Sequence, residues 1–60
     1  MTRDEFIATI IIMKFKAIHK YRYVNDNNKI MLYSDTAVTT INGVSKYHES
    51  YKDAIKRMSS

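Results

Sequence analysis

The stretch AVTTINGVSKYH, residues 37–48, decides the fold predicted for this chain. Its centre is Asn42-Gly43, and Asn-Gly is the strongest short hairpin signal because a type I′ turn needs positive φ at both central residues. The residues on either side are rich in Thr and Val, which favour strands. Residues 37–41 and 44–48 are therefore predicted to pair as an antiparallel hairpin.

A second hairpin is predicted upstream, around the polar run of residues 25–28. This run separates residues 21–24 from residues 29–33, and both flanking segments are rich in strand-forming side chains. Residues 34–36, Ser-Asp-Thr, mark a break or bulge before the next strand. The two hairpins together predict a three- to four-stranded antiparallel meander.

The clearest helix lies at the C-terminal end. Ser50 can cap it, with Asp53 three positions further on. Apolar residues then follow with the spacing that forms one face of a helix: Tyr51, Ala54, Ile55 and Met58. The predicted fold is α+β: a short N-terminal helix, the meander, and this C-terminal amphipathic helix packed on one face.

The first 20 residues allow two interpretations. Thr2-Arg3-Asp4-Glu5 is a capping box, so a helix should begin there. From Ile11 onwards, apolar and basic residues alternate with period two, broken only at Ile18 and His19, which favours a short helix passing into a long strand. The apolar face of that strand would be Ile11, Met13, Phe15, Ala17, Tyr21 and Tyr23. The alternative is one helix from Thr2 to about Lys20.

Length and composition predict one small folded domain, residues 1–60. Of the 60 residues, 45% are hydrophobic and 27% are charged, which is ordinary for a globular protein. A chain of this length buries only roughly 60% of its unfolded surface, so its stability should be a few kcal/mol. It contains no cysteine, which excludes a disulfide and a thiolate zinc site.

No segment is predicted to span a membrane or to direct export. The most apolar run, from Phe6 to Met13, is far too short to cross a bilayer. Asp4 and Glu5 precede it, where a signal peptide needs positive charge. A cytoplasmic location is therefore expected. The abundance of Ile, Lys and Asn suits an AT-rich genome and matches small phage or mobile-element accessory proteins.

The residues that could carry catalysis or bind a metal form no recognisable arrangement. The serines have no nucleophile elbow around them, and Gly43 is the only glycine, which excludes a glycine-rich phosphate loop. Nothing in the sequence brings the carboxylates Asp35 and Glu49 together. The two histidines, His19 and His48, lack the i, i+4 spacing of a helical metal site. We therefore expect no enzymatic activity, no cofactor and no metal.

The net charge is concentrated in one segment. The whole formal excess of +4 lies between residues 14 and 29, where Asp26 stands among the cations Lys14, Lys16, Lys20, Arg22 and Lys29. In the long-strand interpretation, the first four cations share one sheet face. They would form a basic stripe that faces an acidic surface, and Lys29 is predicted to bind the partner with them.

An acidic protein surface is the partner that we expect for this stripe, because it needs only the cations. Nucleic acid is the alternative, with bases stacked on the candidate aromatic anchors Tyr21, Tyr23 and Tyr33. These tyrosines, however, fall on the face opposite the lysines if the strand is regular. Core packing is therefore expected for at least two of them. A third interpretation gives these cations no partner: they would form a solvated sheet face that resists edge-to-edge aggregation.

These features predict a non-enzymatic accessory or regulatory protein that docks on a larger acidic or nucleic-acid-handling protein. Direct, weakly sequence-specific binding of nucleic acid is the alternative, and an oligomeric structural protein is a third class. Self-association is also expected, because the N-terminal helix has more apolar surface than a small sheet can cover. The residues predicted to form that contact are Phe6, Ile7, Ile10 and Ile11.

Overall fold

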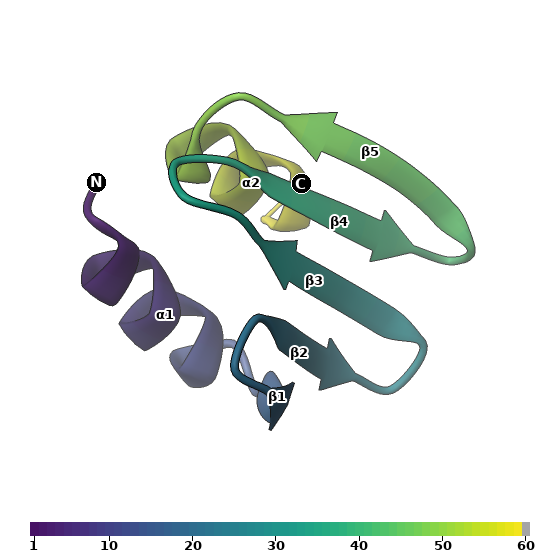
Figure 1. The fold of residues 1–60 in the computed structure, drawn as a ribbon. Helices are drawn as coiled ribbons and strands as arrows, with labels where there is room; N and C mark the ends of the chain where they lie inside the picture. Colours follow the sequence, from purple (N-terminus) through teal and green to yellow (C-terminus); the bar gives the residue numbers. More distant parts are fainter. Residues whose placement is uncertain (60) are drawn as a thin grey trace.

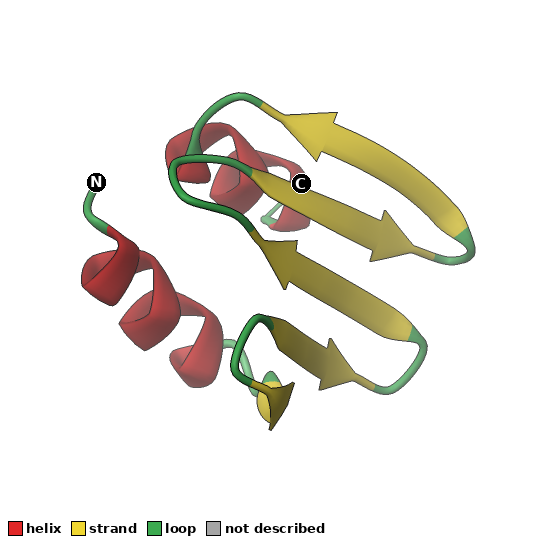
Figure 2. Ribbon diagram, viewed as in Figure 1, coloured by secondary structure: helices red, strands yellow, loops and turns green. Residues whose placement is uncertain are grey.

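A helix, five strands and a second helix follow one another along the chain, and the computed structural model describes them over residues 1–59 (Figure 1). Their bounds are α1 (Arg3–Ile12), β1 (Lys16–His19), β2 (Arg22–Asn25), β3 (Asn28–Leu32), β4 (Ala37–Ile41), β5 (Val44–His48) and α2 (Tyr51–Met58). The strands form one antiparallel sheet in which each strand pairs with the next (Figure 2). The α+β class and the meander are confirmed, and the sheet has five strands instead of three or four.

The β4–β5 hairpin has the turn that its sequence predicts. Asn42 and Gly43 both have positive φ, 52° and 81°. Ile41 and Val44 are paired directly across the turn, so the loop contains two residues, as in a type I′ hairpin.

Both helices begin at the predicted caps. At α1, the Thr2 N–H donates to Glu5 Oε1 (2.8 Å) and the Glu5 N–H donates to Thr2 Oγ1 (3.2 Å), which completes a capping box. At α2, the Asp53 N–H donates to Ser50 Oγ (3.2 Å). Each cap satisfies backbone groups that the first helical turn cannot pair internally.

The end of α1 corrects both interpretations of the first 20 residues. Lys14 adopts a left-handed conformation with φ of 75°. Its N–H donates to the Ile11 carbonyl (3.0 Å), and the Phe15 N–H donates to the Ile10 carbonyl (3.0 Å), which is the pattern of a Schellman motif. Phe15 and Ile10 both enter the core, which stabilises this reversal. A strand from Ile11 is therefore wrong, and so is a single helix to about Lys20.

The segment predicted as one long strand is divided into β1 and β2. A tight turn at Lys20 and Tyr21 separates the strands, and the Tyr21 N–H donates to His19 Nδ1 (3.3 Å). The pairing register shifts between Ala17 and His19, which leaves Ile18 at an irregularity. The two residues that broke the alternation in the sequence therefore mark the end of a strand.

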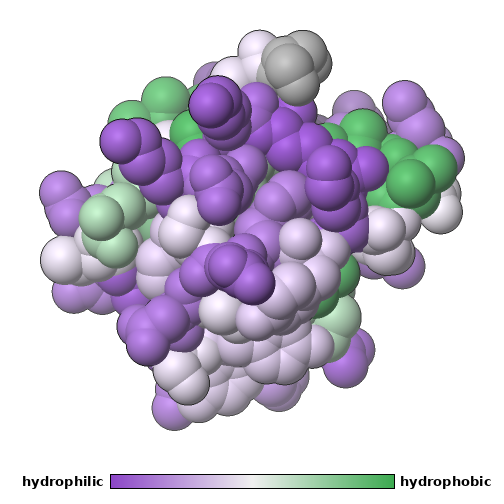
Figure 3. Space-filling model, turned by 90° about the horizontal axis from the view of Figure 1, so that it is seen from above, coloured by the Kyte–Doolittle hydropathy of each residue, from purple (hydrophilic) through white to green (hydrophobic). Residues whose placement is uncertain are grey.

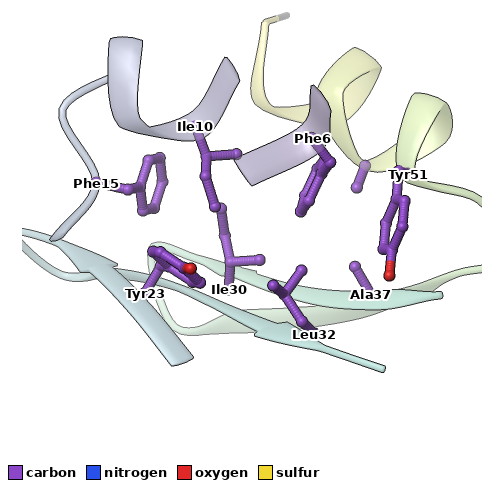
Figure 4. Close-up of a cluster of buried hydrophobic side chains, with 9 residues drawn as sticks. Phe6, Ile10, Phe15, Tyr23, Ile30, Leu32, Ala37 and Tyr51 are labelled. Atoms are coloured by element: carbon purple, nitrogen blue, oxygen red, sulfur yellow. The ribbon is translucent and has the colours of Figure 1, made fainter. Parts of the chain in front are cut away.

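The two helices pack on the same face of the sheet, and the hydrophobic core lies between the two layers (Figure 4). Its buried apolar residues are Phe6, Ile10, Phe15, Tyr23, Ile30, Leu32, Ala37, Tyr51 and Ala54. The rings of Phe6 and Tyr51 stack with centroids 4.7 Å apart and so join α1 to α2. The predicted docking of the C-terminal helix is confirmed. No helix within residues 1–59 is long and apolar enough to cross a membrane.

Candidate functional site

The sheet face that turns away from the helices carries two rows of side chains that cross the strands. Directly paired residues in antiparallel strands point to the same face, so the register places them. One row consists of His19, Arg22, Met31, Val38 and Tyr47. The other consists of Lys16, Val24, Lys29, Thr40 and Ser45. We call these two rows, with the adjoining Ile18, the open face.

The open face is cationic. Lys16, Arg22 and Lys29 lie on it and are exposed. None of the six carboxylates shares this face, because they lie in the helices or in the turns: Asp4, Glu5, Asp26, Asp35, Glu49 and Asp53. Within the described chain, the three cations of the open face form no ion pair. Their positive potential is therefore available to a partner.

Apolar side chains adjoin these cations. Met31, Val38 and Tyr47 are neighbours on three successive strands, β3, β4 and β5. Tyr47 is 58% exposed and Ile18 is 62% exposed, so large apolar groups meet solvent here. Tyr, Met and Arg are enriched in protein interfaces relative to the rest of a protein surface. Arg22, Met31 and Tyr47 are therefore of types that interfaces favour, whereas Lys16, Lys29 and Ser45 are of types that interfaces contain less often.

The structure retains part of the predicted basic stripe and changes the rest. Lys16 and Arg22 share the open face as predicted, and Lys29 joins them from β3. Lys14 does not, because it occupies the left-handed position that ends α1. Lys20 does not either, because it lies in the turn between β1 and β2. The stripe of four residues on one strand is thus replaced by three cations on three strands.

The positions of the tyrosines differ from those expected for one regular strand. Tyr23 is in the core, but Tyr21 and Tyr33 are 40% and 47% exposed, so the expectation that at least two would be buried is wrong. Both line one solvent-open depression of about 600 Å³ beside the open face. We call it the tyrosine notch; its lining residues are Arg3, His19, Tyr21, Arg22, Met31, Leu32, Tyr33 and Ser34. The turn at residues 20 and 21 brings tyrosines and cations to one place.

The residues predicted for self-association are divided between core and surface. Phe6 and Ile10 are completely buried and cannot touch another chain, and Ile7 is packed partly against the core. Ile11 is 54% exposed, and its neighbour Ile12, which the prediction omitted, is 77% exposed. The buried pair lies one helical turn apart on the face that meets the sheet, which explains the difference.

A polar cluster on the covered face was not predicted. Arg57 Nη1 donates to the Thr39 carbonyl (2.9 Å) and to Thr39 Oγ1 (2.8 Å), and Nη2 donates to the Val44 carbonyl (3.1 Å). Thr39 Oγ1 also lies 2.8 Å from His48 Nε2. Because a guanidinium can only donate, the Thr39 hydroxyl accepts from Arg57 Nη1, and the same hydroxyl is hydrogen-bonded to His48 Nε2. From the sequence alone, Arg57 was interpreted only as a cation in the last turn of a helix, where it interacts favourably with the helix dipole.

The surroundings of His48 disfavour its protonated form. Burial lowers its pKa below the ordinary histidine value, and the positive charges of Arg57 and Lys46 lower the pKa further. The negative charge of Asp53 acts in the opposite direction but has a smaller effect. The hydrogen bond between His48 Nε2 and Thr39, together with those of Arg57, joins β5 and α2 to β4.

The two histidines and the acidic residues are spread over different parts of the described chain. His19 and His48 end β1 and β5, the two edge strands of the sheet, so they do not share a site. No group of three or more potential metal ligands occurs in residues 1–59. A depression of about 690 Å³ over β5 and α2 includes Glu49, but Asp35 is not among its lining residues.

Seen from above the view of Figure 1, hydrophobic residues form small separate patches among hydrophilic ones (Figure 3).

Comparison with protein-family models, with curated proteins and with solved structures finds no match for the chain. The geometry and chemistry of the surfaces described above are therefore the guide to its function.

Proposed function

We propose that this protein is a non-enzymatic accessory protein that binds an acidic surface of a larger protein through its open face. The composition of that face supports the proposal: three cations without ion pairs and a contiguous apolar row, with no carboxylate. An acidic partner would be steered by the cations, and burial of the apolar row would supply much of the binding free energy.

The apolar row favours a protein over nucleic acid at this face. Met31 and Val38 are half-buried, and Tyr47 beside them is mostly exposed. Phosphates could contact the cations but offer no apolar surface to these side chains. A protein partner can satisfy both parts of the face.

The size of the face determines how much of it a partner would cover. Five strands about 4.8 Å apart, each with about five residues rising about 3.4 Å, span roughly 24 by 17 Å. A standard interface buries about 800 Å² on each partner, which exceeds that rectangle. We therefore expect the whole open face to lie inside the interface, so that reversal of one charge on it disturbs binding.

The proposal is tested by capturing partners with the protein and with two variants of equal charge. Lys29→Glu reverses a charge on the open face, whereas Lys56→Glu reverses an exposed charge on α2, on the other side of the sheet. In nuclease-treated extract, quantitative mass spectrometry should identify a protein that the wild type and Lys56→Glu capture and Lys29→Glu loses. The purified partner should bind the wild type more weakly as ionic strength rises.

A second variant separates the apolar contribution from the charge. Tyr47→Ala should weaken binding of the purified partner without changing its dependence on salt, because it removes apolar contact and no charge. Equal capture by the wild type, Lys29→Glu and Lys56→Glu would contradict the proposal. Loss of all capture after nuclease treatment would contradict it as well.

A further inference from the structure

The tyrosine notch combines aromatic and cationic groups that three separate segments supply. Arg3 comes from α1, Tyr21 and Arg22 from the β1–β2 turn and β2, and Tyr33 from the residue after β3. Its volume of about 600 Å³ falls within the range of about 300–1,000 Å³ that ligand sites occupy. No carboxylate lines it. The notch therefore favours an anionic ligand with an aromatic part.

The backbone of the notch is held in place by the core. The Tyr21 carbonyl accepts from the Leu32 N–H (2.8 Å), and the Tyr33 N–H donates to the Thr36 carbonyl (2.9 Å). The Tyr51 hydroxyl donates to the Tyr33 carbonyl (2.6 Å) and lies 2.9 Å from the Ser34 carbonyl. Because Tyr51 is stacked on Phe6 in the core, the segment that carries Tyr33 is tied to both helices. Such a site is largely formed before a ligand arrives.

The two tyrosine rings have different surroundings. The Arg3 guanidinium lies 4.9 Å from the centroid of the Tyr21 ring, and the Lys20 ammonium lies 5.4 Å from it. Tyr21 therefore holds two cations near the notch through cation–π contacts. The Tyr33 ring is 47% exposed and has no ring contact within the described chain. One ring positions cations, and the other is available for stacking.

We propose that the tyrosine notch binds a nucleotide unit, with its base stacked on Tyr33 and its phosphate held by Arg3 and Arg22. Lys20 adds positive charge from the turn, and Tyr21 acts as a positioning residue for Arg3. This site is separate from the protein partner proposed above, and the two surfaces share His19, Arg22 and Met31. An acidic peptide would use the cations but would leave the Tyr33 ring without a partner, whereas a nucleotide uses both.

The first experiment measures binding of a short labelled single-stranded oligonucleotide by fluorescence anisotropy at several salt concentrations. Tyr33→Ala should weaken binding about five-fold or more, while Tyr33→Phe, which keeps the ring, should bind like the wild type. Arg3→Gln should reduce the log–log salt slope by about 0.7, because it removes one phosphate contact to a single strand. Lys56→Gln removes an equal charge from α2 and should leave the slope unchanged.

Two competitors distinguish the sources of the ligand. NMR titration with AMP should shift notch resonances in the wild type and not in Tyr33→Ala if free nucleotides are ligands. An oligonucleotide that binds more tightly than AMP assigns the site to a strand. Equal binding of AMP and inorganic phosphate would overturn the proposal, because the base would then contribute nothing.

Further outcomes would also overturn it. Binding of the oligonucleotide within two-fold of wild type in a folded Tyr33→Ala variant would exclude stacking. If polyglutamate displaces the labelled oligonucleotide as effectively as an unlabelled oligonucleotide of equal charge, the notch attracts any polyanion. Tyr47→Ala distinguishes the two proposals, because this variant should bind the protein partner more weakly and bind the oligonucleotide as the wild type does.

Discussion

The two faces of the sheet differ completely in environment, although their residues alternate along the same strands. In β3, Ile30 is 1% exposed, whereas Met31 next to it lies on the open face. In β4, Thr39 is completely buried, whereas Thr40 next to it is half-exposed. The covered face stabilises the fold, and the open face contributes little to it. Stability and binding should therefore separate between adjacent residues, which the following variants test.

The largest contrast is expected in β3. Ile30→Ala should lower the free energy of unfolding by about 2–4 kcal/mol, because it leaves a cavity in the core. Met31→Ala, one residue further, should lower it by less than about 1 kcal/mol. Chemical denaturation followed by circular dichroism measures both. Equal losses would mean that the pairing register is shifted by one residue.

In β4, the contrast concerns the hydroxyl groups of two adjacent threonines, each of which a change to Val removes with little change in side-chain size. Thr39→Val should cost about 1–3 kcal/mol, because it removes the buried hydroxyl that bonds Arg57 Nη1 and His48 Nε2. Thr40→Val removes a hydroxyl that bonds Ser45 Oγ (2.8 Å) on the exposed side, and its effect should stay within about 0.5 kcal/mol. The same denaturation experiment compares them, and similar costs would contradict the cluster.

The covered face should also make stability depend on pH. Because the pKa of His48 is lowered in the folded protein by burial and by Arg57, the unfolded chain takes up a proton first as the pH falls. The free energy of unfolding should be highest above the ordinary histidine pKa of about 6.5 and should decrease as the pH falls through it. Unfolding at pH values between about 7.5 and 5.5 measures this decrease, above the ordinary range of carboxyl groups. A His48→Gln variant with an unchanged pH dependence would assign the effect to another group.

The smallest effect on stability is expected on the open face. Lys29→Glu should change the free energy of unfolding by no more than about 0.5 kcal/mol, because an exposed charge without an ion pair contributes little. The same variant should lose partner capture. Thermal unfolding before the capture experiment checks that the loss reflects binding. A strongly destabilised Lys29→Glu would place this side chain in a packed environment and remove the open face as described.

The parts of the fold that were predicted correctly are those decided within a few residues. Asn42-Gly43 forms its turn because both residues tolerate positive φ, and Ser50 begins α2 because its hydroxyl reaches the Asp53 N–H. The apolar residues of α2, from Tyr51 to Met58, pack on the sheet because they occupy one face of a short helix. Such features depend on local backbone geometry and hydrogen bonds, which the sequence specifies directly.

The candidate sites were predicted less well. A regular strand would have separated the lysines from the tyrosines, but the turn at Lys20 and Tyr21 ends that alternation. The notch then forms because the Tyr21 carbonyl pairs with Leu32, which lies eleven positions along the chain. No local pattern indicates this contact. The cluster of Arg57 with Thr39 likewise joins residues eighteen positions apart.

Patterns among neighbouring residues specify the class of the fold, the β4–β5 turn, both helix caps and the excess of positive charge between residues 14 and 29. The end of α1, in contrast, depends on contacts between distant residues. Lys14 accepts a left-handed conformation because Phe15 gains a place in the core and because the Asn25 side chain donates to the Met13 carbonyl (3.2 Å). Such contacts also decide which face of the sheet the helices cover, and therefore which cations and tyrosines meet solvent. The physical reason is that burial depends on residues far apart in the chain, whereas turns and caps are formed by neighbours.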